Sequence, residues 1–194
     1  MLPYQVTIAG LAELSQFSVA NTDFVVSLLD PGLDARADMR TIHAVPRREF
    51  RFHDTLDPAA GALAPDRSIV GRLLALGEEL DRTRPRRVLI HCHLGMSRST
   101  ATAAMLMAQA APGREAEIPG TLLALRPQAW PNSRMIRDAD DLLAAGGALV
   151  EAGEEVYRRA AMARPYQPHS QRDTGRSAEI PAGYQGRGRH LADA

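Results

Sequence analysis

One short segment of the chain combines a nucleophile, a cation and a hydroxyl group at close spacing. Cys92 and Arg98 are separated by five residues, and Ser99 follows the arginine directly. A loop of this length that leaves a strand and opens a helix gathers backbone N–H groups and the positive end of the helix dipole at one point. The guanidinium of Arg98 adds a planar fork that holds two phosphoryl oxygens at once. The spacing therefore predicts a binding site for one phosphate group.

The same loop is expected to activate the thiol of Cys92. A helix N-terminus and an adjacent cation both favour the thiolate, which is the nucleophilic form of cysteine. Ser99 is placed to offer a hydroxyl to the sulfur, and Gly95 is expected to turn the backbone inward where a side chain would obstruct the ligand. The candidate phosphate-binding residues are His93, Leu94, Gly95, Met96, Ser97 and Arg98.

The flanking elements fit an α/β fold. Residues 88–90 are apolar without alternation, which is typical of a strand covered on both faces, and a small-residue helix is expected at 101–111. Further strands are predicted at 6–9, 24–29 and 49–53, and further helices at 11–20, 66–82, 118–125, 133–145 and 148–163. Asp66 is predicted to be the N-cap of the helix that it begins. The order of elements predicts a central, mostly parallel sheet flanked by helices.

The composition changes after Arg164. Residues 165–194 contain four Gly and three Pro, and their only large aliphatic residues are Ile180 and Leu191. Such a segment buries too little apolar surface to offset the entropy cost of ordering it. We therefore expect one folded domain over 1–164 and a flexible, mobile C-terminal tail over 165–194.

The composition also excludes several classes of function. All 23 basic residues are Arg, so no mechanism that needs a lysine is open to this chain. The 23 acidic residues balance them, and a net charge of zero gives no overall field that attracts nucleic acid or a membrane surface. The single cysteine forms no intrachain disulfide, and the first residues lack the basic start of a signal peptide. We expect a cytoplasmic protein with no nucleic-acid or membrane partner.

The residues His91-Cys92, five intervening positions and Arg98-Ser99 resemble the signature of the cysteine-dependent protein tyrosine phosphatases. The Gly95-x-Ser97-Arg98-Ser99 form is typical of small bacterial enzymes of the dual-specificity type. The resemblance implies a dual-specificity phosphatase-like catalytic domain over 1–164 and a two-step hydrolysis of phosphate monoesters through a cysteinyl-phosphate. It also implies that His91 is a catalytic-site residue that orders the loop through hydrogen bonds and is not the general base.

Enzymes of this family use an aspartate on a separate, upstream loop to protonate the leaving oxygen and then to activate water. Three residues are candidates here. Asp54 follows the predicted strand at 49–53 and best resembles the family's position, although its 38-residue separation from Cys92 is somewhat long. The excess length is attributed to an insertion over 58–65. Asp57 is the alternative, and Asp66 is interpreted as a helix cap.

Other polar residues near these motifs have simpler interpretations. His91, Cys92 and His93 are consecutive and lack a spaced partner set, so we expect no metal site and no cofactor. Asn132 is interpreted mainly as a helix cap, with a supporting role beside the active site as the alternative. Arg47 and Arg48 form either an anion-attracting rim or a solvated pair.

Two rival functions stay open from the sequence. A catalytically weak phosphoprotein-binding module of the same fold would retain the phosphate loop, but the presence of Cys92, Arg98, Ser99 and a candidate acid argues against it. A phosphatase for phosphoinositides or other non-protein phosphates is the second rival. His93, Leu94 and Met96 make the loop nearly neutral, whereas loops of that type carry several basic residues. A phosphorylated protein is therefore the expected substrate and partner.

Overall fold

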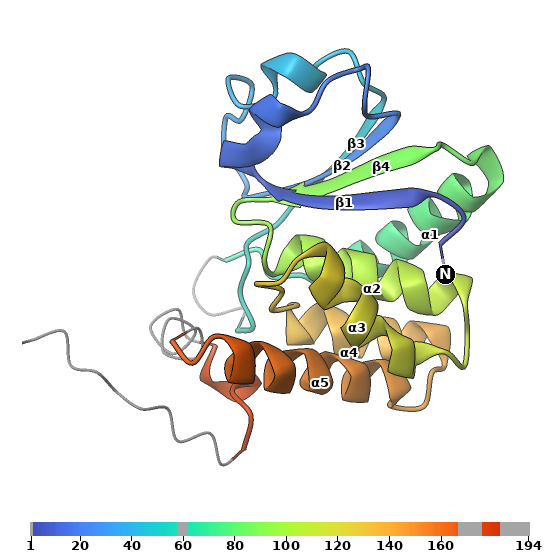
Figure 1. Cartoon of the computed structure of the whole chain (residues 1–194), viewed down its shortest axis with the longest axis vertical. Helices are drawn as coiled ribbons and strands as arrows, with labels where there is room; N and C mark the ends of the chain where they lie inside the picture. Colours follow the sequence, from blue (N-terminus) through green and yellow to red (C-terminus); the bar gives the residue numbers. More distant parts are fainter. Residues whose placement is uncertain (1, 58–61, 167–175, 183–194) are drawn as a thin grey trace, which may run out of the picture.

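A parallel sheet forms the centre of the molecule. The structure is a computed structural model that describes residues 2–57, 62–166 and 176–182. In these residues the sheet has four strands in the order β1-β4-β2-β3, and every pairing is parallel (Figure 1). The strands are β1 (Gln5–Gly10), β2 (Phe24–Leu29), β3 (Arg47–Arg51) and β4 (Arg87–Cys92). The expected central parallel sheet is confirmed.

Each face of the sheet has its own core. Val26, Leu28 and Ile90 point to the face that the α-helices cover. Val25 and Leu89 point to the opposite face, where residues from the segments between β1 and β2 and between β2 and β3 cover them (Figure 1). Because successive side chains of a strand alternate between faces, a strand buried on both sides is apolar throughout. This burial explains the unbroken apolar run of β4.

Five α-helices are formed by the described residues, and they lie on one side of the sheet (Figure 1). They are α1 (Arg67–Thr83), α2 (Arg98–Ala110), α3 (Ile118–Leu125), α4 (Ser133–Leu143) and α5 (Ala148–Ala163). The carboxylate of Asp66 accepts a hydrogen bond from the Ile69 amide at 2.8 Å, which confirms it as the N-cap of α1. No helix among these residues is both long and apolar enough to span a lipid bilayer.

Two predicted elements differ from the observed ones. The helix expected at 11–20 is a short 3₁₀ helix, η1 (Leu11–Gln16), because Asn21 accepts a hydrogen bond from the Ser18 amide and forms a competing turn. The strand expected at 49–53 lies two residues earlier. Its partner β2 ends at Leu29, which pairs with Arg51, so the following residues have no strand beside them.

The C-terminal segment also differs from its expectation in part. Residues 167–175 and 183–194 of the expected mobile tail lie outside the described residues. Residues 176–182, in contrast, pack onto the domain, and the side chains of Arg176 and Glu179 are buried. Their opposite charges pair with each other at 2.7 Å. Composition alone underestimated how ordered residues 176–182 are, because ion pairs order a short segment as well as apolar burial does.

Candidate active site

The predicted phosphate loop lies between the last residue of β4 and the first residue of α2. Cys92 ends the strand and Arg98 begins the helix, so the N-terminus of α2 meets the end of the sheet at the loop. Cys92 faces the helix-covered side of the sheet, where it is 2% exposed. The loop therefore has the flanking elements that the sequence predicted.

His91 points to the opposite face of the sheet from Cys92. Its Nε2 atom lies 2.7 Å from the hydroxyl of Ser27, the residue paired with it on β2. Burial, together with the nearby positive charges of Arg47 and Arg98, lowers the pKa of His91 to about 4. His91 is therefore neutral near pH 7, and its ring links β4 to β2.

The carbonyl groups of the loop are bound from outside it. The amide of Leu11 donates to the His93 carbonyl at 2.9 Å, and the amide of Trp130 donates to the Met96 carbonyl at 2.8 Å. Arg126 donates to the carbonyls of the two residues between them, at 2.9 and 3.0 Å. Each N–H of a trans peptide points away from the preceding C=O. The loop amides after His93 thus point to its inner side, where a phosphate would lie.

Gly95 turns the backbone, as the sequence predicted, and the neighbouring strand adds a second requirement for glycine that the sequence did not indicate. Its φ angle is +66°, in the left-handed region that favours glycine. A Cβ atom at this position would lie 2.5 Å from the carbonyl carbon of Ala9 and 2.7 Å from the amide nitrogen of Gly10. The loop therefore packs against the backbone end of β1, and only a residue without a side chain fits.

We expect Gly95→Ala to destabilise the protein more than Gly113→Ala does. Both glycines have positive φ, so both substitutions carry a conformational cost of about 1–2 kcal/mol and a similar change in unfolded-state entropy. Gly113 has open space around a new Cβ, whereas Gly95 does not. Denaturant unfolding of the two variants isolates the steric contribution, and equal losses would contradict the packing of the loop against β1.

The predicted nucleophile and the predicted cation of the loop have defined partners. The sulfur of Cys92 lies 3.2 Å from the hydroxyl oxygen of Ser99, as the sequence predicted. Nη1 of Arg98 donates to the carboxylate of Asp30 and to the carbonyl of Phe52, both at 2.6 Å. The Nε atom of Arg98 is buried without a hydrogen-bond partner among the described residues. A buried N–H of this kind is costly unless a ligand accepts a hydrogen bond from it. The guanidinium is therefore held by Asp30 and Phe52 and still has an N–H that can donate to a ligand.

Asp54 is the predicted acid candidate that reaches the loop. Its Oδ1 atom accepts hydrogen bonds from the hydroxyl of Ser97 at 2.7 Å, the side-chain amide of Asn132 at 2.9 Å and the guanidinium of Arg176 at 2.8 Å. Burial raises the pKa of this carboxyl, but the charges of Arg176 and Arg98 and these hydrogen bonds outweigh burial. The net effect holds the pKa of Asp54 below its usual value.

The remaining polar candidates separate into those at the site and those away from it. Asn132 fulfils both interpretations, since it caps α4 through its side-chain oxygen and donates to Asp54. Asp57 is exposed on the chain that follows Asp54 and does not line the cavity. Arg48 pairs with Glu79 at 3.1 Å, and Arg47 contacts the sulfur of Met39. The two arginines form no rim around the loop.

Sequence reasoning missed three charged residues at the site. Asp30, which follows β2, holds Arg98 and lies 3.4 Å from the His93 ring. Arg126 holds the loop carbonyls, and Arg176 binds Asp54. Asp30 had one available signal, because parallel strands bring their carboxyl ends to the same edge of a sheet. Neither arginine had a comparable signal.

A cavity of about 620 Å³ brings these residues together. The residues that line it are Asp30, His53, Asp54, Cys92, His93, Leu94, Met96, Ser97, Arg98, Trp130 and Arg176. Of the predicted phosphate-binding residues, only Gly95 is not part of the lining. The cavity thus places a thiol, two guanidinium groups and two carboxylates around one space.

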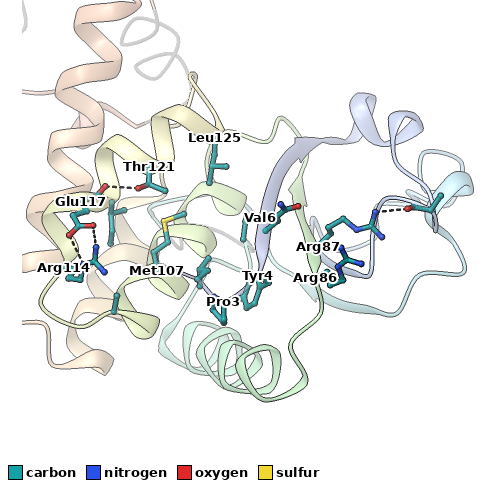
Figure 2. Close-up of a pocket in the computed structure, with 15 residues that line it drawn as sticks. Pro3, Tyr4, Val6, Arg86, Arg87, Met107, Arg114, Glu117, Thr121 and Leu125 are labelled. Atoms are coloured by element: carbon teal, nitrogen blue, oxygen red, sulfur yellow. Dashed lines mark hydrogen bonds and ion pairs between the residues drawn. The ribbon is translucent and has the colours of Figure 1, made fainter.

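A larger cavity of about 880 Å³ lies at the other end of β4, beside Arg86 and Arg87 (Figure 2). Its walls include Tyr4 and Met107 but no residue of the phosphate loop. Arg87 pairs with Asp23, and Arg114 pairs with Glu117 (Figure 2). We therefore place the candidate active site at the smaller cavity, where the reactive groups lie.

Comparisons with known proteins support the fold. The chain resembles the phosphatase domain of Yvh1 from Chaetomium thermophilum with a TM-score of 0.51 and 18% identity over 73% of this chain and 91% of that one. Human DUSP28 gives 0.52 and 18% over 74% and 94%, and PTP-2 phosphatase of Cydia pomonella gives 0.52 and 21% over 71% and 84%. No family model and no curated protein matches the chain. The fold is that of the dual-specificity and protein tyrosine phosphatases, as the phosphate-loop residues had indicated.

Proposed function

We propose that this protein hydrolyses phosphate monoesters through a cysteinyl-phosphate on Cys92. The observation that carries the proposal is the meeting of three groups in one cavity: the Cys92 sulfur, the Arg98 guanidinium, whose Nε has no partner among the described residues, and the Asp54 carboxyl. A phosphoryl group in the loop would accept from the inward-pointing amides and from Arg98. These donors stabilise the negative charge of the equatorial oxygens as the bond to the leaving group breaks.

In the first step the Cys92 thiolate attacks phosphorus and the bond to the leaving oxygen breaks. Asp54 gives its proton to that oxygen, so the product leaves as a neutral alcohol or phenol. The carboxyl must therefore be protonated in the complex. A bound phosphate dianion provides for this, because its negative charge raises the pKa of a neighbouring carboxyl.

In the second step water attacks the phosphorus of the cysteinyl-phosphate. Asp54, now ionised, takes a proton from the water, the P–S bond breaks and inorganic phosphate is released. The electron pair of that bond returns to sulfur and regenerates the thiolate. The Ser99 hydroxyl, 3.2 Å from the sulfur, supports the thiolate as the leaving group of this step.

The proposed substrate is a phosphorylated side chain of a protein. Leu94 and Met96 give the loop apolar positions at the cavity, and Leu94 is 69% exposed. Arg176 adds a cation to the lining, but all of its N–H groups have protein partners, so it offers no site for the additional phosphates of an inositol headgroup. This arrangement favours a tyrosine or dual-specificity phosphatase over a phosphoinositide phosphatase.

We expect the full chain to release phosphate from phosphopeptides faster than from phosphoinositides. The measurement is kcat/KM on matched phosphotyrosine, phosphoserine and phosphothreonine peptides and on a phosphoinositide panel, with Cys92→Ser as the blank. Turnover of all three peptides indicates a dual-specificity enzyme, and turnover of phosphotyrosine alone indicates a deeper pocket. Faster turnover of the phosphoinositides would overturn the substrate class. Peptide binding without any turnover would favour the phosphoprotein-binding module.

A further inference from the structure

Arg176 reaches the candidate active site from the C-terminal segment 176–182. Its side chain is buried and lines the same cavity as Cys92, although it lies beyond α5 in the chain. Its Nη1 atom donates to Oδ1 of Asp54 at 2.8 Å and to the hydroxyl of Ser97. The segment therefore contributes a charged group directly to the proposed acid.

The guanidinium of Arg176 is fully used by protein partners. Nε donates to Glu179 at 2.7 Å, and Nη2 donates to Glu179 at 2.9 Å and to the Trp130 carbonyl at 3.4 Å. Together with the two bonds of Nη1 to Asp54 and Ser97, these contacts use all five N–H donors. Arg176 therefore has no donor left for a phosphate, which argues against a direct substrate contact.

The hydrogen bonds to Asp54 all fall on one oxygen. Oδ1 accepts from Ser97, Asn132 and Arg176, whereas Oδ2 has no hydrogen-bond partner within the part of the chain that the structure describes. A carboxyl held in this way has a single free oxygen with a fixed direction. Oδ2 is thus the atom that remains for the proton that the leaving group receives.

Glu179 ties the position of Arg176 to the rest of the domain. Its Oε1 accepts from the amide of Ser133 at 2.7 Å, at the start of α4, and both of its oxygens accept from Arg176. The cap of that helix, Asn132, donates to the same Asp54 oxygen as Arg176 does. The N-terminus of α4 and the C-terminal segment therefore hold Asp54 together.

We propose that Arg176 is a positioning residue that orients the Asp54 carboxyl and sets its charge, so that the segment 176–182 completes the active site. This inference rests on the proposed function. Asp54 acts with Oδ2 exposed to the substrate, while Arg176 favours the ionised carboxylate that activates water in the second step. The bound phosphate dianion opposes Arg176 and favours the protonated form that the first step requires.

The direct test is the titration of the Asp54 carboxyl by carbon NMR in the phosphate-free full chain, with Asp54→Asn to assign the signal. The charged neighbours of the Asp54 carboxyl are Arg176 and Arg98. Arg176 is in turn paired with Glu179, and Arg98 with Asp30. An opposite charge at this range lowers a carboxyl pKa by about 1–3 units. We therefore expect Arg176→Gln to move the titration of Asp54 upward by about 1 unit or more. Arg176→Lys keeps the charge and should move it less.

Two further variants serve as controls for this measurement. Arg176→Gln leaves the buried Glu179 without its cation, so the double variant Arg176→Gln/Glu179→Gln serves where the single one unfolds. Arg158→Gln removes an exposed arginine of α5 that pairs with Glu155, and it should leave the Asp54 titration unchanged. If the titration of Asp54 is unchanged in folded Arg176→Gln, or in the double variant where the single one unfolds, the proposal is overturned.

The kinetic test separates positioning from a purely structural role. The protonated form of an acid is lost as the pH rises through its pKa. A higher pKa of Asp54 therefore moves the alkaline limb of the kcat/KM profile to higher pH in Arg176→Gln. With a poor leaving group, kcat should fall on the order of 10- to 100-fold in both Arg176→Gln and Arg176→Lys, with KM nearly constant. An unmoved limb in Arg176→Gln contradicts the proposal. If the wild type shows no turnover while the NMR shift appears, the proposed function fails and the control of Asp54 by Arg176 stands.

Discussion

Replacing Cys92 by serine is expected to abolish hydrolysis of an aryl phosphate, with a loss of kcat on the order of 10⁴-fold or more. A serine hydroxyl is not ionised near neutral pH, and among the described residues the side chain at position 92 hydrogen-bonds to Ser99 and to no histidine ring. His91, the adjacent histidine, points to the opposite face of the sheet, where it contacts Ser27. The measurement is the release of the phenol product under single-turnover and steady-state conditions.

The same variant should still bind inorganic phosphate. The loop amides and Arg98 provide the binding, and neither depends on the sulfur. Calorimetric titration of phosphate into wild type and Cys92→Ser checks this, with thermal unfolding to confirm that both are folded. Persistent turnover in Cys92→Ser would dismiss the nucleophile assignment, and loss of phosphate binding in a folded variant would contradict the phosphate cradle.

Replacing Asp54 by asparagine is expected to reduce kcat on the order of 10²- to 10⁴-fold, with the largest loss for substrates that have poor leaving groups. Asparagine is nearly isosteric and keeps an oxygen toward Ser97 and Arg176, but it has no proton to give and takes none from water. A series of aryl phosphates with phenols of increasing pKa measures the effect. The slope of log kcat against phenol pKa should be steeper in the variant than in wild type.

Asp57→Asn is the matched control for this prediction. It removes a carboxylate three residues further along the same loop, where the side chain is exposed and does not line the cavity. We expect its kcat to stay close to that of wild type. A greater loss in Asp57→Asn than in Asp54→Asn would show that the acid is assigned to the wrong residue.

The conformation of residues 92–98 was predictable because the neighbouring residues specify it locally. Cys92 and Arg98 lie on a strand end and a helix start that their own neighbours specify: apolar residues without alternation before the cysteine, and small residues suited to a helix after the arginine. The bounds of α3 and α5 agree with the predicted 118–125 and 148–163 for the same reason. Local spacing also placed Ser99 beside the sulfur.

The sequence by itself determined which groups carry the proposed chemistry, and only the tertiary structure decided how they are held. Asp30 and Arg98 are 68 residues apart, and Arg176 and Asp54 are 122 residues apart, yet each pair forms an ion pair. Gly95 likewise packs against the end of β1. Hydrophobic periodicity reports what one segment buries, but not which distant segment it meets. The partners of the candidate catalytic groups are set by the packing of the whole chain, and so they became visible only in the fold.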